Sequence, residues 1–116
     1  MDGKTPLFYT CIKGNERVVK YIVELGLDIN QENKFGTTAL FYACSGGNEK
    51  IIKYLIEKGV NINKTCNLGY ISLFYACKSG IEAIVKYLIE HGADINNEDV
   101  DGRTALLMHV KVEINQ

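Results

Sequence analysis

The chain has 116 residues, of which 47% are hydrophobic and 23% are charged, a composition typical of a globular protein built around one core. Thirteen basic and fourteen acidic residues give a formal net charge of −1. The sequence therefore lacks the strong positive charge that general binding to nucleic acid or to an anionic membrane requires. We expect a single domain over residues 1–116 that binds neither.

The cysteines and the N-terminus point to a reducing compartment. Four cysteines are too few for a disulfide-stapled mini-domain, and no two of them form a Cys-x-x-Cys motif. The first residues contain no apolar signal core, and no stretch approaches the length of about eighteen apolar residues that a membrane span needs. The sequence predicts a soluble, intracellular protein, and we expect it in the cytoplasm.

A repeat of 33 residues runs through the chain. Glycines recur at Gly3, Gly36, Gly69 and Gly102, leucines at Leu7, Leu40, Leu73 and Leu106, and tyrosines at Tyr21, Tyr54 and Tyr87. Several further sets of residues keep the same spacing, so the repeat is not accidental. Three full units cover residues 2–34, 35–67 and 68–100, and a partial fourth unit covers 101–116.

Each unit begins with a turn and a helix of about two turns. Pro6 suits the first position of this helix in the first unit, because its missing N–H is not needed there. Thr38 and Thr104 are placed to cap the equivalent helices of the second and last units through their hydroxyls. In the third unit Ile71 replaces the threonine and removes its cap, so this helix is expected to rely on Ser72 instead or to fray.

After a glycine, each full unit continues with a longer, amphipathic helix. In the second unit the stretch 49–58 places Ile52, Leu55 and Ile56 on one face, and Gly59 ends it. The loop that follows is rich in Asn and Asp, whose side chains bond to their own backbone in turns. We predict that this loop leads into the next unit as a hairpin.

No catalytic or cofactor motif is present in the sequence, which has no phosphate-binding loop, no His-Glu-x-x-His and no Gly-x-Ser-x-Gly. We predict that the protein is not an enzyme and uses neither a cofactor nor a metal. His91 lies in the predicted last turn of a longer helix, where a cation suits the negative helix end. His109 is interpreted as an exposed residue at the end of the repeat array.

Cys11, Cys44 and Cys77 recur 33 positions apart, which could indicate a metal or redox site. Equivalent residues of stacked units lie about 8–10 Å apart, too far for a disulfide or a shared zinc ion. We therefore interpret these thiols as buried packing residues. Cys66 lies in a polar loop and is expected to be exposed. All four cysteines should be reduced in a protein that is monomeric or only weakly self-associating.

Lys20, Lys53 and Lys86 also recur, and a basic surface for phosphates is one interpretation. Each lysine has a glutamate four residues before it and another four residues after it. This spacing places opposite charges side by side on a helix. We favour a solvated outer face in which the charges neutralise one another.

The units resemble ankyrin repeats. The family's Thr-Pro-Leu-His signature corresponds to Thr5-Pro6-Leu7-Phe8 and Thr38-Ala39-Leu40-Phe41, and its Gly-Ala-Asp-Ile-Asn motif is present unchanged at Gly92-Ala93-Asp94-Ile95-Asn96. The signature histidine is replaced by Phe or Leu in every unit, so apolar packing should replace a polar contact. The resemblance implies an all-α solenoid of stacked helix-turn-helix units with connecting β-hairpin-like loops.

The resemblance also implies a function and a surface. Members of the family are non-catalytic protein–protein interaction modules that bind a partner through the hairpin tips and the concave face of the shorter helices. The corresponding hairpin positions here are Lys34, Phe35, Thr37, Leu68, Tyr70 and Arg103, together with Asn67. The corresponding positions on the shorter helices are Tyr9, Tyr42, Tyr75 and Met108, with Ser45 and Lys78 nearer the helix ends.

Two alternatives stay open at this point. The tyrosines could pack between neighbouring helices instead of binding a partner, and the units could be a structural spacer within a longer array. If Tyr42 and Tyr75 face solvent beside Phe35, Leu68 and Tyr70, these side chains form one aromatic strip over the second and third units. In that case replacing Tyr42 or Tyr70 should change the thermal stability little, because neither ring belongs to the core. The identity of the partner does not follow from the sequence.

Overall fold

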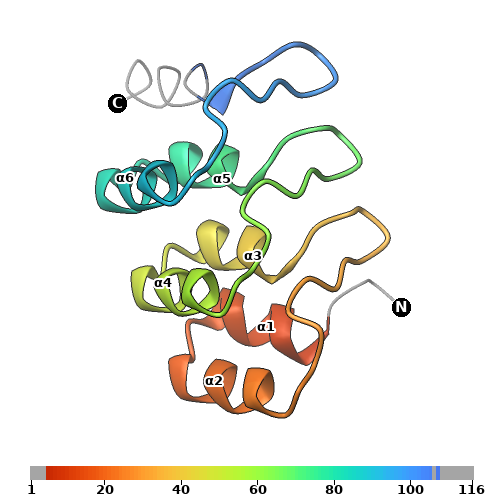
Figure 1. The fold of residues 1–116 in the computed structure, drawn as a ribbon, viewed down its shortest axis with the longest axis vertical. Coiled ribbons are helices and arrows are strands. Elements are labelled where there is room, and N and C mark those ends of the chain that lie inside the picture. Colours follow the sequence, from red (N-terminus) through yellow and green to blue (C-terminus); the bar gives the residue numbers. More distant parts are fainter. Residues whose placement is uncertain (1–4, 106, 108–116) are drawn as a thin grey trace.

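The computed structural model describes residues 5–105 and 107, and it shows three pairs of helices stacked on one another (Figure 1). The first pair is α1 (Pro6–Lys13) and α2 (Glu16–Glu24), the second is α3 (Ala39–Gly46) and α4 (Glu49–Glu57), and the third is α5 (Ser72–Ser79) and α6 (Glu82–Glu90). The hairpins project to one side, next to α1, α3 and α5 (Figure 1). The expected all-α stack of helix pairs is confirmed.

The three shorter helices begin in different ways. Thr5 caps α1, because its Oγ1 accepts a hydrogen bond from the Phe8 N–H at 3.2 Å. The cap predicted for Thr38 is wrong: its side chain is buried in the core, and the hydroxyl has no hydrogen-bond partner. Ile71 precedes α5 and is also buried, and α5 begins at the buried Ser72 with no side-chain cap bond, so Ser72 does not replace the threonine cap. Packing therefore replaces the cap in the third unit.

The longer helices also differ in whether a side chain caps their first turn. Asn48 caps α4, since its Oδ1 accepts the Ile51 N–H at 3.0 Å, while its Nδ2 donates to the Gly14 carbonyl of the preceding unit at 3.3 Å. Asn15 caps α2 in the same manner. The equivalent residue before α6 is Ile81, which makes no side-chain cap bond. Both helices of the third unit therefore begin without a side-chain cap.

Small buried residues fill the space between α1, α3 and α5. Ala43, Cys44 and Ala76 are fully buried, and Cys11 and Cys77 lie at the equivalent contacts. Burial raises the pKa of the Cys11 and Cys44 thiols to about 12, because the thiolate would lose its hydration. These cysteines are packing residues, as the spacing predicted.

Ion pairs and tyrosine rings lie along α2, α4 and α6, which we call the outer helices. Glu49 pairs with Lys53 at 3.0 Å, and the equivalent pairs of α2 and α6 lie at 3.1 and 3.3 Å. Lys53 also lies over the ring of Tyr87 in the next unit, with its Nζ 5.3 Å from the ring centroid. His91 stacks on the same ring at the end of α6. The lysines thus belong to a locally neutralised face, whereas His109 lies outside the described residues.

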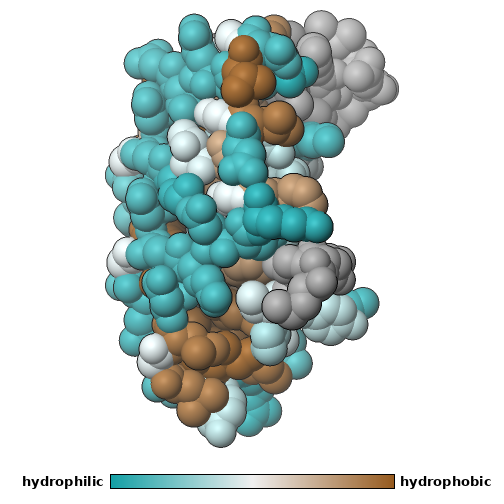
Figure 2. All heavy atoms as spheres, turned by 90° about the vertical axis from the view of Figure 1, so that its right-hand side faces the viewer, coloured by the Kyte–Doolittle hydropathy of each residue, from teal (hydrophilic) through white to brown (hydrophobic). Residues whose placement is uncertain are grey.

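The first helix pair has an uncovered outer end. Val18 and Leu27 are 37% and 51% exposed, whereas the equivalent Ile51 and Val60 of the second unit are buried by the unit before them. Seen toward the hairpin tips, hydrophobic residues gather at the first-unit end of an otherwise largely hydrophilic surface (Figure 2). Each unit therefore completes the burial of the next one.

Three five-residue hairpins connect the units, and each closes through one backbone bond from its first N–H to its last carbonyl. In the first hairpin, residues 33–37, the Asn33 Oδ1 accepts the N–H groups of Phe35 and Thr37 at 2.9 and 3.1 Å. In the third hairpin, residues 99–103, Asp99 accepts the N–H groups of Asp101 and Arg103, both at 2.9 Å. One polar side chain therefore fastens each of these turns.

The second hairpin, residues 66–70, lacks this fastening. Its first residue is Cys66, and among the described residues no N–H group of the hairpin bonds to the thiol. The expectation that Cys66 is exposed is wrong: it is 8% exposed and lies beside the hydroxyl of Tyr70. An aromatic residue thus stands where the other hairpins have Thr37 and Arg103.

We expect Ile81→Asn to raise the free energy of unfolding by about 1 kcal/mol, because it restores both bonds that Asn48 makes. Urea denaturation measures the change. Ile81→Ala is the matched control, since it shortens the side chain without supplying a cap. Equal stabilities of the two variants would contradict the assignment.

We expect Cys66→Asn to stabilise the chain by about 1 kcal/mol, because an amide oxygen there can accept the Leu68 and Tyr70 N–H groups. Cys66→Ala, which removes the thiol and adds no acceptor, should not gain stability. Thermal unfolding of both variants tests this. A Cys66→Asn variant no more stable than Cys66→Ala would show that the second hairpin cannot adopt the same fastening.

Candidate functional site

The hairpins are bonded to one another at their tips. The Asn67 N–H donates to the Phe35 carbonyl at 3.0 Å, and its Nδ2 donates to the Lys34 carbonyl at 2.8 Å. One unit further on, the Val100 N–H donates to the Leu68 carbonyl at 2.9 Å. These bonds hold the tips in register, so side chains of neighbouring hairpins face the same groove.

An aromatic cluster connects the second hairpin to the shorter helices. The ring of Tyr70 stacks on Phe74 with centroids 5.2 Å apart, and it also contacts Phe41 and Tyr75. The hydroxyls of Tyr70 and Tyr75 lie 3.1 Å apart and share a hydrogen bond. Partial burial, and then this bond, raise the pKa of the Tyr70 hydroxyl well above its usual range.

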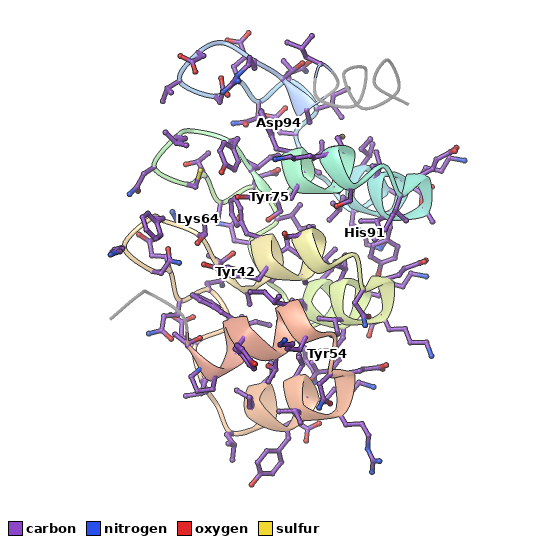
Figure 3. All side chains as sticks on the ribbon, turned by 180° about the vertical axis from the view of Figure 1, so that it is seen from behind. Tyr42, Tyr54, Lys64, Tyr75, His91 and Asp94 are labelled. Carbon is purple, nitrogen blue, oxygen red and sulfur yellow. The ribbon has the colours of Figure 1, made fainter. Side chains whose placement is uncertain are left out.

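Tyr42 occupies the equivalent place in the second unit. Its ring stacks on Phe8 of the first unit with centroids 4.9 Å apart, and its hydroxyl accepts a 2.8 Å bond from the Asn33 Nδ2. Tyr42 and Tyr75 lie one above the other between the helices and the hairpins, whereas Tyr54 and His91 lie on the opposite side (Figure 3). Phe35 of the first hairpin, Tyr42 of α3 and Tyr75 of α5 therefore lie in the same region, on the hairpin side of the shorter helices.

These elements enclose a pocket of about 400 Å³, which we call the aromatic pocket. Its walls are mainly aromatic rings, and Phe35 and Leu68 at its rim are 54% and 56% exposed. The lining residues are Phe35, Thr37, Phe41, Tyr42, Ser45, Cys66, Asn67, Leu68, Tyr70 and Tyr75. The size falls within the range of pockets that hold a small molecule or a peptide side chain, about 300–1,000 Å³.

The structure brings together most of the residues named from the sequence. Eight of them line the aromatic pocket: Phe35, Thr37, Tyr42, Ser45, Asn67, Leu68, Tyr70 and Tyr75. Lys78 and Arg103 line a smaller adjoining pocket of about 110 Å³ that shares Tyr70 and Tyr75. Lys34 lies at the rim, with its Nζ 5.2 Å from the ring centroid of Phe35.

Two of the named residues lie elsewhere. Tyr9 does not line the aromatic pocket, and its ring lies under Lys13 at the end of α1. Met108 is outside the described residues. Sequence reasoning missed Phe41 and Cys66, although comparison of Cys66 with Asn33 and Asp99 at the equivalent positions would have singled out the second hairpin.

The expectation that Tyr42 and Tyr70 lie outside the core is wrong. Both rings are only partly exposed and pack against the buried cluster, as does Tyr75. The reason is that their partners, Phe8 and Phe41, belong to the neighbouring unit, so the rings fill the gap between units. Tyr42 and Tyr70 therefore combine a packing role with exposure to the pocket.

The pocket offers contact area rather than reactive groups. Among the residues that the structure describes, its lining contains no carboxylate and no imidazole, and so no acid–base pair of the kind that catalysis uses. Within residues 5–105 and 107, no three His, Cys, Asp or Glu side chains gather where they could hold a metal ion. No helix in this part of the chain is long and apolar enough to cross a membrane.

The nearest carboxylate beside the pocket is already neutralised. Asp99 is buried, and its Oδ2 lies 2.8 Å from the Arg103 Nε. The backbone N–H of Arg103, followed by that of Asp101 and by the guanidinium, holds the pKa of the Asp99 carboxyl below its usual range. Arg103 is therefore committed to the third hairpin and is less free for a ligand than Lys78.

Comparison with known proteins agrees with the repeat pattern. The family model for ankyrin repeats in three copies matches residues 1–66, 15–99 and 63–112. No curated protein matches the chain. Because the family matches together extend from residue 1 to residue 112, the chain belongs to the ankyrin-repeat family.

Proposed function

We propose that the chain binds a partner protein across the groove between the shorter helices and the hairpins, with the aromatic pocket at the centre of the contact. Ankyrin repeats are generally protein–protein interaction modules. The observation that carries the proposal is the aromatic pocket, which spans the second and third units and has an exposed apolar rim.

The rim residues have no role in the core that would explain them. Phe35 and Leu68 stand at hairpin tips with more than half of their surface exposed. Apolar groups grouped at the edge of a pocket are typical of binding surfaces, and tyrosine contributes large contact area with little loss of side-chain entropy. Rigid support comes from the bonds between the hairpins, which limit the ordering cost of binding.

The outer face is a weaker candidate. Its lysines are paired with glutamates of their own helix, and Lys20 and Lys53 also lie over tyrosine rings of the next unit. The alternative function, a spacer within a longer array, would leave the groove without a ligand. Variants of the groove separate these possibilities.

Tyr70→Ala should lower the free energy of unfolding by about 3 kcal/mol, because it removes a ring packed on three other aromatic rings. Leu68→Ala, at an exposed rim position, should change it by about 0.5 kcal/mol or less. Chemical denaturation measures both. Similar losses in the two variants would contradict the distinction between packing and rim residues.

The double variant Phe35→Ala/Leu68→Ala should weaken binding of the natural partner by about 2 kcal/mol or more, because it removes the pocket rim. The partner is captured by the immobilised wild-type chain, identified by mass spectrometry, purified and titrated calorimetrically. The control is Leu25→Ala/Leu27→Ala, which removes equally exposed apolar groups at the first-unit end. Unchanged affinity in the rim variant would refute the proposed site and place the contact elsewhere on the chain, whereas a chain that captures no partner would favour the spacer function.

A further inference from the structure

We propose that the aromatic pocket takes one large apolar side chain from an acidic, extended peptide segment of the partner, and that Lys34 and Lys78 contact the carboxylates that flank this side chain. The inference rests on the proposed function and specifies the chemistry of its partner. It follows from two properties of the groove, the lining of the pocket and the distribution of charge around it.

The lining favours an apolar group. Four of the ten lining residues carry hydroxyl groups on Thr or Tyr side chains, but these groups are engaged with one another or with Asn33. The Tyr70 and Tyr75 hydroxyls bond to each other, and the Tyr42 hydroxyl is bonded to the Asn33 amide. Ser45 adds a hydroxyl at the exposed edge, so a polar ligand group would find few free partners, whereas an apolar side chain would gain contact with five aromatic rings and lose only water.

Two lysines next to the aromatic pocket lack a carboxylate partner among the described residues. Lys34 stands at the rim, and Lys78 stands beside Tyr75 in the adjoining pocket. Neither lysine forms an ion pair with any residue that the structure describes. Exposed lysines without carboxylate partners attract an acidic ligand and suppress a basic one.

Three acidic groups on the hairpin side already contact a cation. Asp99 and Asp101 both bond to Arg103, and Glu32 pairs with Lys64 at 2.8 Å. Six glutamates lie instead on α2, α4 and α6, away from the hairpin side, together with five basic residues. Among the described residues beside the aromatic pocket, Lys34 and Lys78 are therefore the cations that remain available to complement an acidic segment.

The two lysines also define how the segment lies. Lys34 is in the first hairpin and Lys78 is at the end of α5, and residues of the aromatic pocket lie between these two elements. A short segment with its apolar side chain in the pocket can therefore carry an acidic residue on each side of that side chain. A small neutral molecule would use the rings and leave both lysines without a partner.

The test selects phage-displayed random peptides on the full chain. Peptides that bind should contain Trp, Phe or Leu with Asp or Glu on both sides. Binding, measured by fluorescence anisotropy, should weaken about tenfold or more in Ser45→Trp, in which an exposed, pocket-lining residue is enlarged to fill the site. Lys50→Trp, at an exposed position of α4, is the matched control and should bind like the wild type.

Charge reversal tests the role of the lysines. Lys34→Glu/Lys78→Glu should weaken binding of the selected peptides about tenfold, with a smaller loss at high salt, because the contacts are exposed ion pairs. Arg17→Glu/Lys50→Glu changes the net charge equally on the outer helices and should have little effect. Circular dichroism and thermal unfolding confirm that each variant is folded. The rim variant Phe35→Ala/Leu68→Ala replaces Ser45→Trp if the latter does not fold.

The outcomes separate this inference from the proposed function. Neutral or basic peptides that lose binding in Ser45→Trp would overturn the acidic partner but keep the groove as the binding surface. Peptides whose binding is unaffected by every groove variant would overturn both proposals. A selection that enriches no peptide on the wild-type chain over the blocked variant would overturn the peptide-anchor inference, and titration of the natural partner would then decide the proposed function alone.

Discussion

The close approach of neighbouring shorter helices is the contact on which the rest of the structure depends. Ala43, Cys44 and Ala76 are fully buried between these helices. At Gly46 a Cβ atom would lie only 3.0 Å from the Ile12 carbonyl oxygen, so a larger residue would push α1 and α3 apart. Because this distance is short, successive hairpins come within hydrogen-bonding reach, and the groove acquires a continuous wall.

The second hairpin shows how stability and recognition compete in such a stack. In the first and third hairpins an Asn or Asp side chain accepts hydrogen bonds from the hairpin's own backbone. The second hairpin has a thiol at that position and a tyrosine four residues later. The second hairpin thus lacks the side-chain to backbone hydrogen bonds of the other two and has the aromatic surface of Tyr70 instead. The exchange is tolerated because the Tyr70 ring packs on Phe41 and Phe74, which contributes stability through the neighbouring units instead.

Much of the fold was predictable because the 33-residue period repeats every local signal three times. The helix pairs and the buried cysteine spacing follow from comparing equivalent positions, and most of the pocket residues follow from the surface that the family resemblance implies. The errors concern contacts between units. How closely two units approach is not encoded in any single unit. This distance determines the burial of Thr38, the position of Cys66 beside Tyr70 and the packing of Tyr42 on Phe8.

The buried thiols also determine how the protein responds to oxidants. Burial raises the pKa of the Cys44 thiol to about 12, so the thiolate, which is the form that reacts with peroxides and disulfides, is scarce at neutral pH. Cys11 shares this protection. Chemical damage at these positions must therefore wait for two units to separate, so the rate of thiol oxidation becomes a measure of how often the stack opens.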